Sequence, residues 1–189
     1  MVYKKLLLQH QRFGGIHYTD VGGVIDCYTQ YGVVCQEFPF KHLPESKELP
    51  KRDWFDEDGE DSYIPKDGLK AKAYDLEVKF LYVNNSDEER KRSSSTMTES
   101  ELVAKMKTDL VSFINNLYGK DNDGASLMKI YDEYTCTGRR GVYVLSVDND
   151  LFFNSDSSSD VIAQFKVKFR VTDPITEVQN NNGTLIEDE

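Results

Sequence analysis

The sequence has few of the residues on which most catalytic and metal sites depend. Its 189 residues include only three histidines and three cysteines. His10, His17 and His42 lack the HxxxH and HxE spacings that zinc sites favour. The sequence has neither a phosphate-binding loop nor a GxSxG nucleophile motif. We therefore expect no catalytic residue, no cofactor, no metal site and no small-molecule substrate.

The three cysteines, Cys27, Cys35 and Cys136, form no CxxC pair. An odd number without paired spacing is typical of reduced thiols in a cytosolic product. Cys27 and Cys35 lie in a stretch with strand character, so we expect them to pack in the interior. A cysteine nucleophile would need a histidine partner in space, and no spacing in the sequence indicates one.

Long apolar runs are also absent. A membrane-spanning helix needs roughly 20 consecutive apolar residues, and no run approaches that length. The apolar stretch near the N-terminus ends at Gln9, short of the roughly 7–15 residues that a signal peptide requires. We expect an unexported protein with no membrane contact.

Basic charge is in short supply. Lysine and arginine total 23 against 33 aspartates and glutamates, which gives a formal net charge of −10. Binding to nucleic acid regardless of sequence requires a basic face that displaces counterions. The charge balance argues against that function, although a ring-shaped assembly can present one face of either sign. We expect no sequence-specific nucleic-acid partner either.

Strand patterning, in contrast, is abundant. Apolar and polar residues alternate through Val161–Val171, which is typical of a strand with one buried and one wet face. Leu69–Val83 alternates in a similar way after a turn at 65–68. Further strands are expected at Val24–Glu37, Ser126–Thr135 and Gly141–Asp148. A turn at 137–141 would join the last two of these strands.

One amphipathic helix is expected over about 98–118. Thr98 and Glu101 fit a capping box at its start. Apolar residues then recur at three- and four-residue spacing, and Gly119 is a natural left-handed terminator. The predicted fold class is therefore α+β, mainly β: an antiparallel β-sandwich or barrel-like sheet with this helix packed on it.

Three segments have compositions that disfavour burial. The first, at 84–96, combines asparagines, charged residues and serines, and the second, at 154–160, is almost entirely Ser, Asp and Asn. The third is 175–189, which we predict to be a flexible acidic tail. The preceding residues, 1–174, would form a single domain.

The acidic stretch at 53–61 is a candidate binding site for a hard cation such as calcium. With Gly59 at the glycine position of an EF-hand loop, Trp54 and Pro65 fall at the first and last ligand positions. The stretch is therefore either an ion-binding loop outside that template or a solvated acidic loop.

One aromatic pair, Trp54-Phe55, lies amid the acidic residues, and Tyr63-Ile64 follows them. Large apolar side chains among acidic residues have two interpretations. Either the loop folds back onto its own domain, or these residues anchor a partner. The sequence leaves both open.

The order of these features resembles a family of phage tail proteins. Its elements are an opening Tyr-Gly-Val at 31–33, an extended segment at 43–54 with an acidic continuation, a strand at 74–80, a helix ending Leu-Tyr-Gly at 117–119 and a closing strand at 165–174. Together they resemble the N-terminal domain of distal tail proteins of long-tailed bacteriophages and prophages. The resemblance spans roughly 24–174 and consists of loose patterns of residue type.

The resemblance implies a structural virion protein. Distal tail proteins form the ring between tail tube and baseplate, and the related tail-terminator and tail-tube proteins share a β-sandwich with one flanking helix and typically build six-fold rings. The implied partners are copies of the same chain and other tail proteins, in a virion tail assembled in the host cytoplasm. The alternatives are a tail-terminator ring subunit, or a non-phage carbohydrate- or calcium-binding β module.

Overall fold

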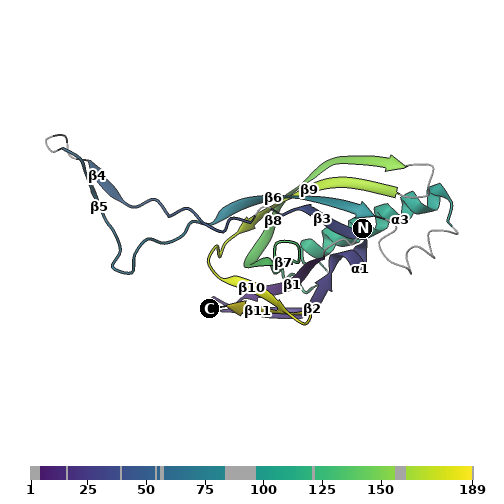
Figure 1. The fold of residues 1–189 in the computed structure, drawn as a ribbon, viewed down its shortest axis with the longest axis horizontal. Coiled ribbons are helices and arrows are strands. Elements are labelled where there is room, and N and C mark those ends of the chain that lie inside the picture. The colour runs from purple at the N-terminus through teal and green to yellow at the C-terminus, as the bar shows by residue number, and fades with distance from the viewer. Residues whose placement is uncertain are drawn as a thin grey trace.

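The computed structural model has a mostly antiparallel β fold with a sandwich-like arrangement, which confirms the predicted α+β, mainly β, class (Figure 1). The structure describes residues 5–188 apart from 16, 39, 54, 56, 57, 84–96, 121 and 156–160, and excludes the side chains of 37, 60, 99, 149–155, 161 and 162. Its elements are β1 (Leu6–Phe13), β2 (Tyr18–Asp26), α1 (Cys27–Tyr31), β3 (Val33–Glu37), β4 (Lys51–Asp53), β5 (Glu60–Ser62), β6 (Tyr74–Val83), α3 (Glu99–Leu117), β7 (Leu127–Asp132), β8 (Thr137–Ser155), β9 (Val161–Val171), β10 (Glu177–Asn181) and β11 (Thr184–Asp188).

The larger sheet follows the order β2-β1-β7-β8-β9-β6-β3, and the β10–β11 hairpin joins it through β8. Side chains from β1 and β7 near one end and from β6 and β9 near the other enter the same core. The sheet therefore curves around that core. Helix α3 covers it with buried side chains that include Leu102, Phe113 and Leu117.

Strand β9 matches the predicted Val161–Val171, and its inward residues from Ala163 to Val171 are buried. It pairs with β6 in antiparallel register, with Phe165 opposite Phe80. Their rings stack at 5.4 Å, and Phe113 of α3 meets both rings edge-on at 5.5 and 6.0 Å. Aromatic contacts therefore join the helix to the sheet at this point.

Helix α3 begins and ends as the sequence predicts. The capping box is present, and Glu101 Oε2 accepts from the Thr98 backbone N–H at 2.7 Å. Gly119 follows the helix with φ of +71°. A Cβ atom there would lie 2.3 Å from the Ala125 carbonyl oxygen, so both the backbone angle and the close approach require glycine.

The continuous strand predicted at Val24–Glu37 is wrong, because helix α1 interrupts it between β2 and β3. Asp26 caps this helix by accepting from the backbone N–H groups of Tyr28 and Thr29 at 3.0 and 3.3 Å. Gly32 ends it in the left-handed conformation, with φ of 67°. The aspartate cap and the glycine stop outweigh the strand propensity of the residues between them.

The turn predicted at 137–141 is also wrong, because β8 already begins at Thr137. The chain reverses earlier, where Asp132 accepts from the Thr135 backbone N–H at 3.0 Å and Cys136 takes a positive φ of 53°. Gly138 is needed for packing and not for a turn. A Cβ atom there would lie 2.7 Å from the Val178 carbonyl oxygen, so the glycine allows close packing of β10.

Two further predicted boundaries differ. A turn does form at 65–68, where the Gly68 N–H donates to the Pro65 carbonyl at 2.9 Å, but β6 starts only at Tyr74. At the other boundary, β8 extends through 154 and 155, which were predicted to be loosely ordered. Residues 156–160 and the predicted loose segment 84–96 lie outside the described residues.

The flexible acidic tail predicted at 175–189 is wrong as well, because β10 and β11 form a hairpin there. Asn182 and Gly183 form its turn with positive φ angles of 51° and 87°, as an Asn-Gly hairpin turn requires. Val178 and Leu185 are buried in a second, smaller core with residues of β1 and β7. One buried apolar residue on each strand, Val178 and Leu185, therefore anchors the hairpin despite its acidic composition.

Candidate interaction arm

The residues between the buried Phe40 and Tyr74 form an arm, defined here as 42–73, which projects away from the body of the fold (Figure 1). At its base the Lys72 N–H donates to the Glu45 carbonyl and the Lys47 N–H donates to the Lys70 carbonyl, both at 2.7 Å. Further out, β4 and β5 pair in register. The arm is therefore a long two-stranded hairpin with its own hydrogen-bond ladder.

Large apolar side chains on the arm face solvent. Phe55 at the tip is fully exposed, and Tyr63 and Ile64 are 68% and 63% exposed. Further towards the base, Leu43 and Leu69 are also exposed. The alternative that this loop folds back onto its own domain fails for Phe55, Tyr63 and Ile64, and residue 54 lies outside the described residues.

The arm has little to stabilise it alone. Isolated two-stranded hairpins are marginally stable in water, because neither face packs against a third layer. Lys51, Arg52 and Asp53 of β4 are all exposed. A segment that extends into solvent with an unpacked apolar surface gains stability when a partner covers it.

Acidic residues of the arm lie on both strands. Asp61 sits opposite Arg52, but Asp53 and Glu60 sit opposite one another. Across the described part of the chain, which omits residues 56 and 57, no group of three His, Cys, Asp or Glu side chains is placed to hold a metal ion. Residues 56 and 57 and the side chain of residue 60, which belong to the 53–61 stretch, lie outside the described residues.

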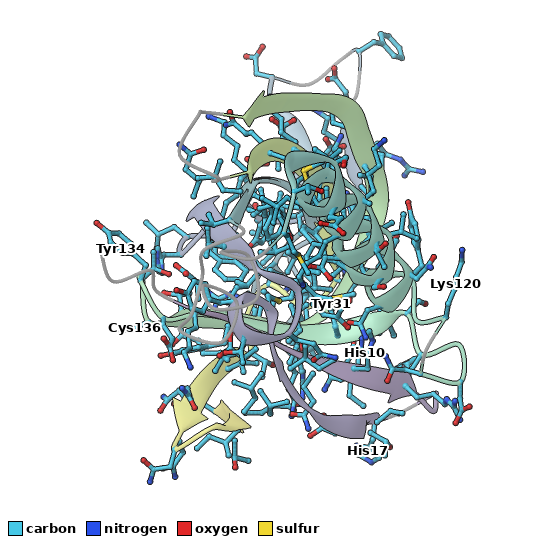
Figure 2. The ribbon with its side chains drawn as sticks, turned by 90° about the vertical axis from the view of Figure 1, so that its right-hand side faces the viewer. His10, His17, Tyr31, Lys120, Tyr134 and Cys136 are labelled. Carbon is cyan, nitrogen blue, oxygen red and sulfur yellow. The ribbon has the colours of Figure 1, made fainter. Side chains whose placement is uncertain are left out.

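His10 and Cys27 both lie in the interior of the fold. His10 is fully buried, with Nδ1 2.8 Å from the Ala125 carbonyl and Nε2 3.1 Å from Asn116 Oδ1, which gives it a structural role. Burial raises the pKa of the Cys27 thiol well above its ordinary value, which disfavours the nucleophilic thiolate. Figure 2 shows His17 well separated from Cys136.

Within the described residues, no helix is both long and apolar enough to cross a membrane.

The sequence indicated the arm's chemistry but not its form. The sequence contains the extended segment, the acidic stretch and the large apolar residues beside it, and the structure places Phe55, Tyr63 and Ile64 together on one projection. The groups that hold its base were missed. Phe40 and Tyr74 flank the arm and lie beside Arg139 of β8, a long-range contact that periodicity does not encode.

No protein-family model and no curated protein matches the chain. Among solved structures, the chain is similar to the Dit protein of SPP1, described as a paradigm of the hub adsorption apparatus in phages that infect Gram-positive bacteria. The identity is 14% and the TM-score 0.48, over 82% of this chain and 49% of that protein. The chain thus spans about half of that protein's length. At this level the similarity establishes no function for the chain.

Proposed function

We propose that the chain is a structural subunit of a long-tailed phage or prophage tail, and that it forms a distal-tail-like ring joining the tail tube to the baseplate. The order of its motifs over roughly 24–174 resembles the N-terminal domain of distal tail proteins. The mainly β fold with helix α3 against one core is of the kind that this resemblance implies. The partners are then other copies of the chain and neighbouring tail proteins.

The observation that carries the proposal is the arm. A closed ring needs a heterologous interface, in which one surface of a subunit contacts a different surface of the next. An arm that projects from the body with Phe55, Tyr63 and Ile64 exposed provides one such surface. Strands β2 and β3 end the main path of the described sheet and leave further edges for pairing.

The proposal is tested by the assembly state of the purified protein. Electron microscopy of the intact chain at rising concentration should reveal closed rings, with six copies as the number that the resemblance implies. Rings that add to the end of a purified tail tube would support the distal position. A protein that forms no ring, either alone or with tail tubes, would contradict a ring-subunit role.

A further inference from the structure

Arg139 lies where the arm meets the C-terminal hairpin. Its side chain is only 2% exposed, and its guanidinium carbon is 5.9 Å from the centre of the Phe40 ring. Phe40 is the last buried residue before the arm, and Tyr74 is the first strand residue after it. Arg139 Nη1 also donates to Oε1 of Glu177, the first residue of β10, at 3.3 Å. One buried cation therefore contacts both elements.

The base of the arm is organised around these groups. The Lys41 backbone N–H donates to the Tyr74 hydroxyl at 3.3 Å, and the Lys41 ammonium lies 5.7 Å from the centre of the Tyr74 ring. Burial raises the pKa of Tyr74, while Lys41 and the nearby Arg139 guanidinium oppose that rise. Phe38 packs against Phe40 with ring centres 4.1 Å apart. The strands entering and leaving the arm are thus both fixed beside Arg139.

The guanidinium has few hydrogen-bond acceptors. Nη1 bonds to the Gly138 carbonyl at 3.0 Å and to Glu177, while the buried Nε has no hydrogen-bond partner among the described residues. A buried charge that loses its counter-ion is costly to leave in place. If Glu177 moves away, the guanidinium is therefore expected to shift towards water or towards the acceptors at the arm base.

The hairpin contact itself depends on a close approach. Glu177 is the residue of β10 that pairs with β8, directly opposite Arg139. Gly138, next to Arg139, leaves room for the Val178 carbonyl oxygen, which would lie 2.7 Å from a Cβ atom at that position. The distance between β10 and β8 thus determines whether Glu177 reaches the guanidinium.

We infer that Arg139 couples the C-terminal hairpin to the arm, so that displacing the hairpin loosens the base of the arm. A partner that binds and moves either element then changes the other, because both contact the same buried cation. A molecule that binds at the hairpin would therefore change the base of the arm without contacting the arm.

The test is hydrogen exchange on the intact chain carrying Glu177→Ala. The amides of Lys41 and Lys72 report on the arm base, because each donates a hydrogen bond there. Both should exchange roughly tenfold faster than in the unmodified protein. Glu177→Gln, which keeps an oxygen acceptor but loses the charge, should give a smaller change of the same kind.

A second variant and a control make the test specific. Gly138→Ala crowds the Val178 carbonyl of β10 and also the Ile130 carbonyl of β7, while Arg139 and Glu177 remain. It should also speed exchange at Lys41 and Lys72. Gln179→Ala removes an exposed side chain on the same strand, whose hydrogen bond to Asp188 stays within the hairpin, and it should leave both amides unchanged. Unchanged arm amides in Glu177→Ala, or equal acceleration in the control, would overturn the inference.

Discussion

The ammonium nitrogen of Lys129 lies 2.8 Å from a carboxylate oxygen of Asp20 and 3.1 Å from one of Glu187. This buried cation joins strand β2 at the edge of the sheet to the last strand of the chain. Its side chain is only 5% exposed, so water screens the attraction weakly.

Replacing Lys129 by alanine should lower the free energy of unfolding by about 2–4 kcal/mol, because it leaves two carboxylates facing each other around a partly buried site. Denaturant unfolding measures the change. Lys166→Ala is the matched control: Lys166 pairs with Glu77 at 3.1 Å on the wet face and should cost less than about 1 kcal/mol. Equal losses for the two variants would show that the Lys129 network adds nothing to hairpin docking.

Acid should weaken the docking of the hairpin. Burial alone would raise the pKa values of Asp173 and Glu187, but hydrogen bonds from Arg140, and from Lys129 to Glu187, outweigh it and hold both pKa values below their ordinary range. Each group therefore binds fewer protons in the folded state. Its contribution to stability is present above an unfolded pKa of about 4 and is lost as the pH falls through the folded pKa.

Denaturant midpoints for the unmodified protein should therefore fall as the pH is lowered from about 6 to about 3. The double variant Asp173→Asn, Glu187→Gln should be less stable at the higher pH and should change less over the same range. A parallel decline in both proteins would assign the acid sensitivity to other carboxylates.

The stacked pair at the centre of the core sets another expectation. Phe165 is buried between Phe80 and Phe113, so Phe165→Ala should destabilise the fold by about 3–5 kcal/mol. Val111→Ala, at a residue of α3 that is 60% exposed, should change stability by less than about 0.5 kcal/mol. A small effect at Phe165 would mean that this face of β9 is not core.

The glycine after α3 can be tested against a second glycine. Gly119→Ala combines a left-handed backbone angle with a clash at the Ala125 carbonyl, and should cost about 2 kcal/mol or more. Gly23→Ala meets no atom within 4 Å and should fall within about 0.5 kcal/mol of the unmodified protein. Thermal unfolding compares the two, and similar values would remove the special role of Gly119.

Local signals in the sequence located the elements that depend on local chemistry. The alternation in Val161–Val171 and the helix limits at Thr98 and Gly119 are confirmed, because each follows from side-chain periodicity or capping within a few residues. Helix α1 was missed although its signals, Asp26 and Gly32, are also local. There, the aspartate cap and the glycine stop outweigh the β-like composition of the surrounding residues.

Long-range contacts account for the other misses. The hairpin at 177–188 is acidic, and its docking depends on Lys129 and Arg140, which are far from it in sequence. The arm was recognisable as an unusual segment, but the exposure of Phe55 and the buried anchor at Arg139 required the folded structure. Composition alone does not show which acidic segment meets a buried cation.

The proposed ring depends on the arm as an assembly surface. Light scattering after size-exclusion chromatography tests this claim on the chain carrying Tyr63→Asp and on the chain carrying Tyr134→Asp. Both tyrosines are largely exposed, at 68% and 73%, but only Tyr63 lies on the arm. We predict that the arm variant loses the ring and elutes as a smaller species, while Tyr134→Asp keeps the mass of the unmodified assembly. A ring that survives Tyr63→Asp with its mass unchanged would contradict the claim.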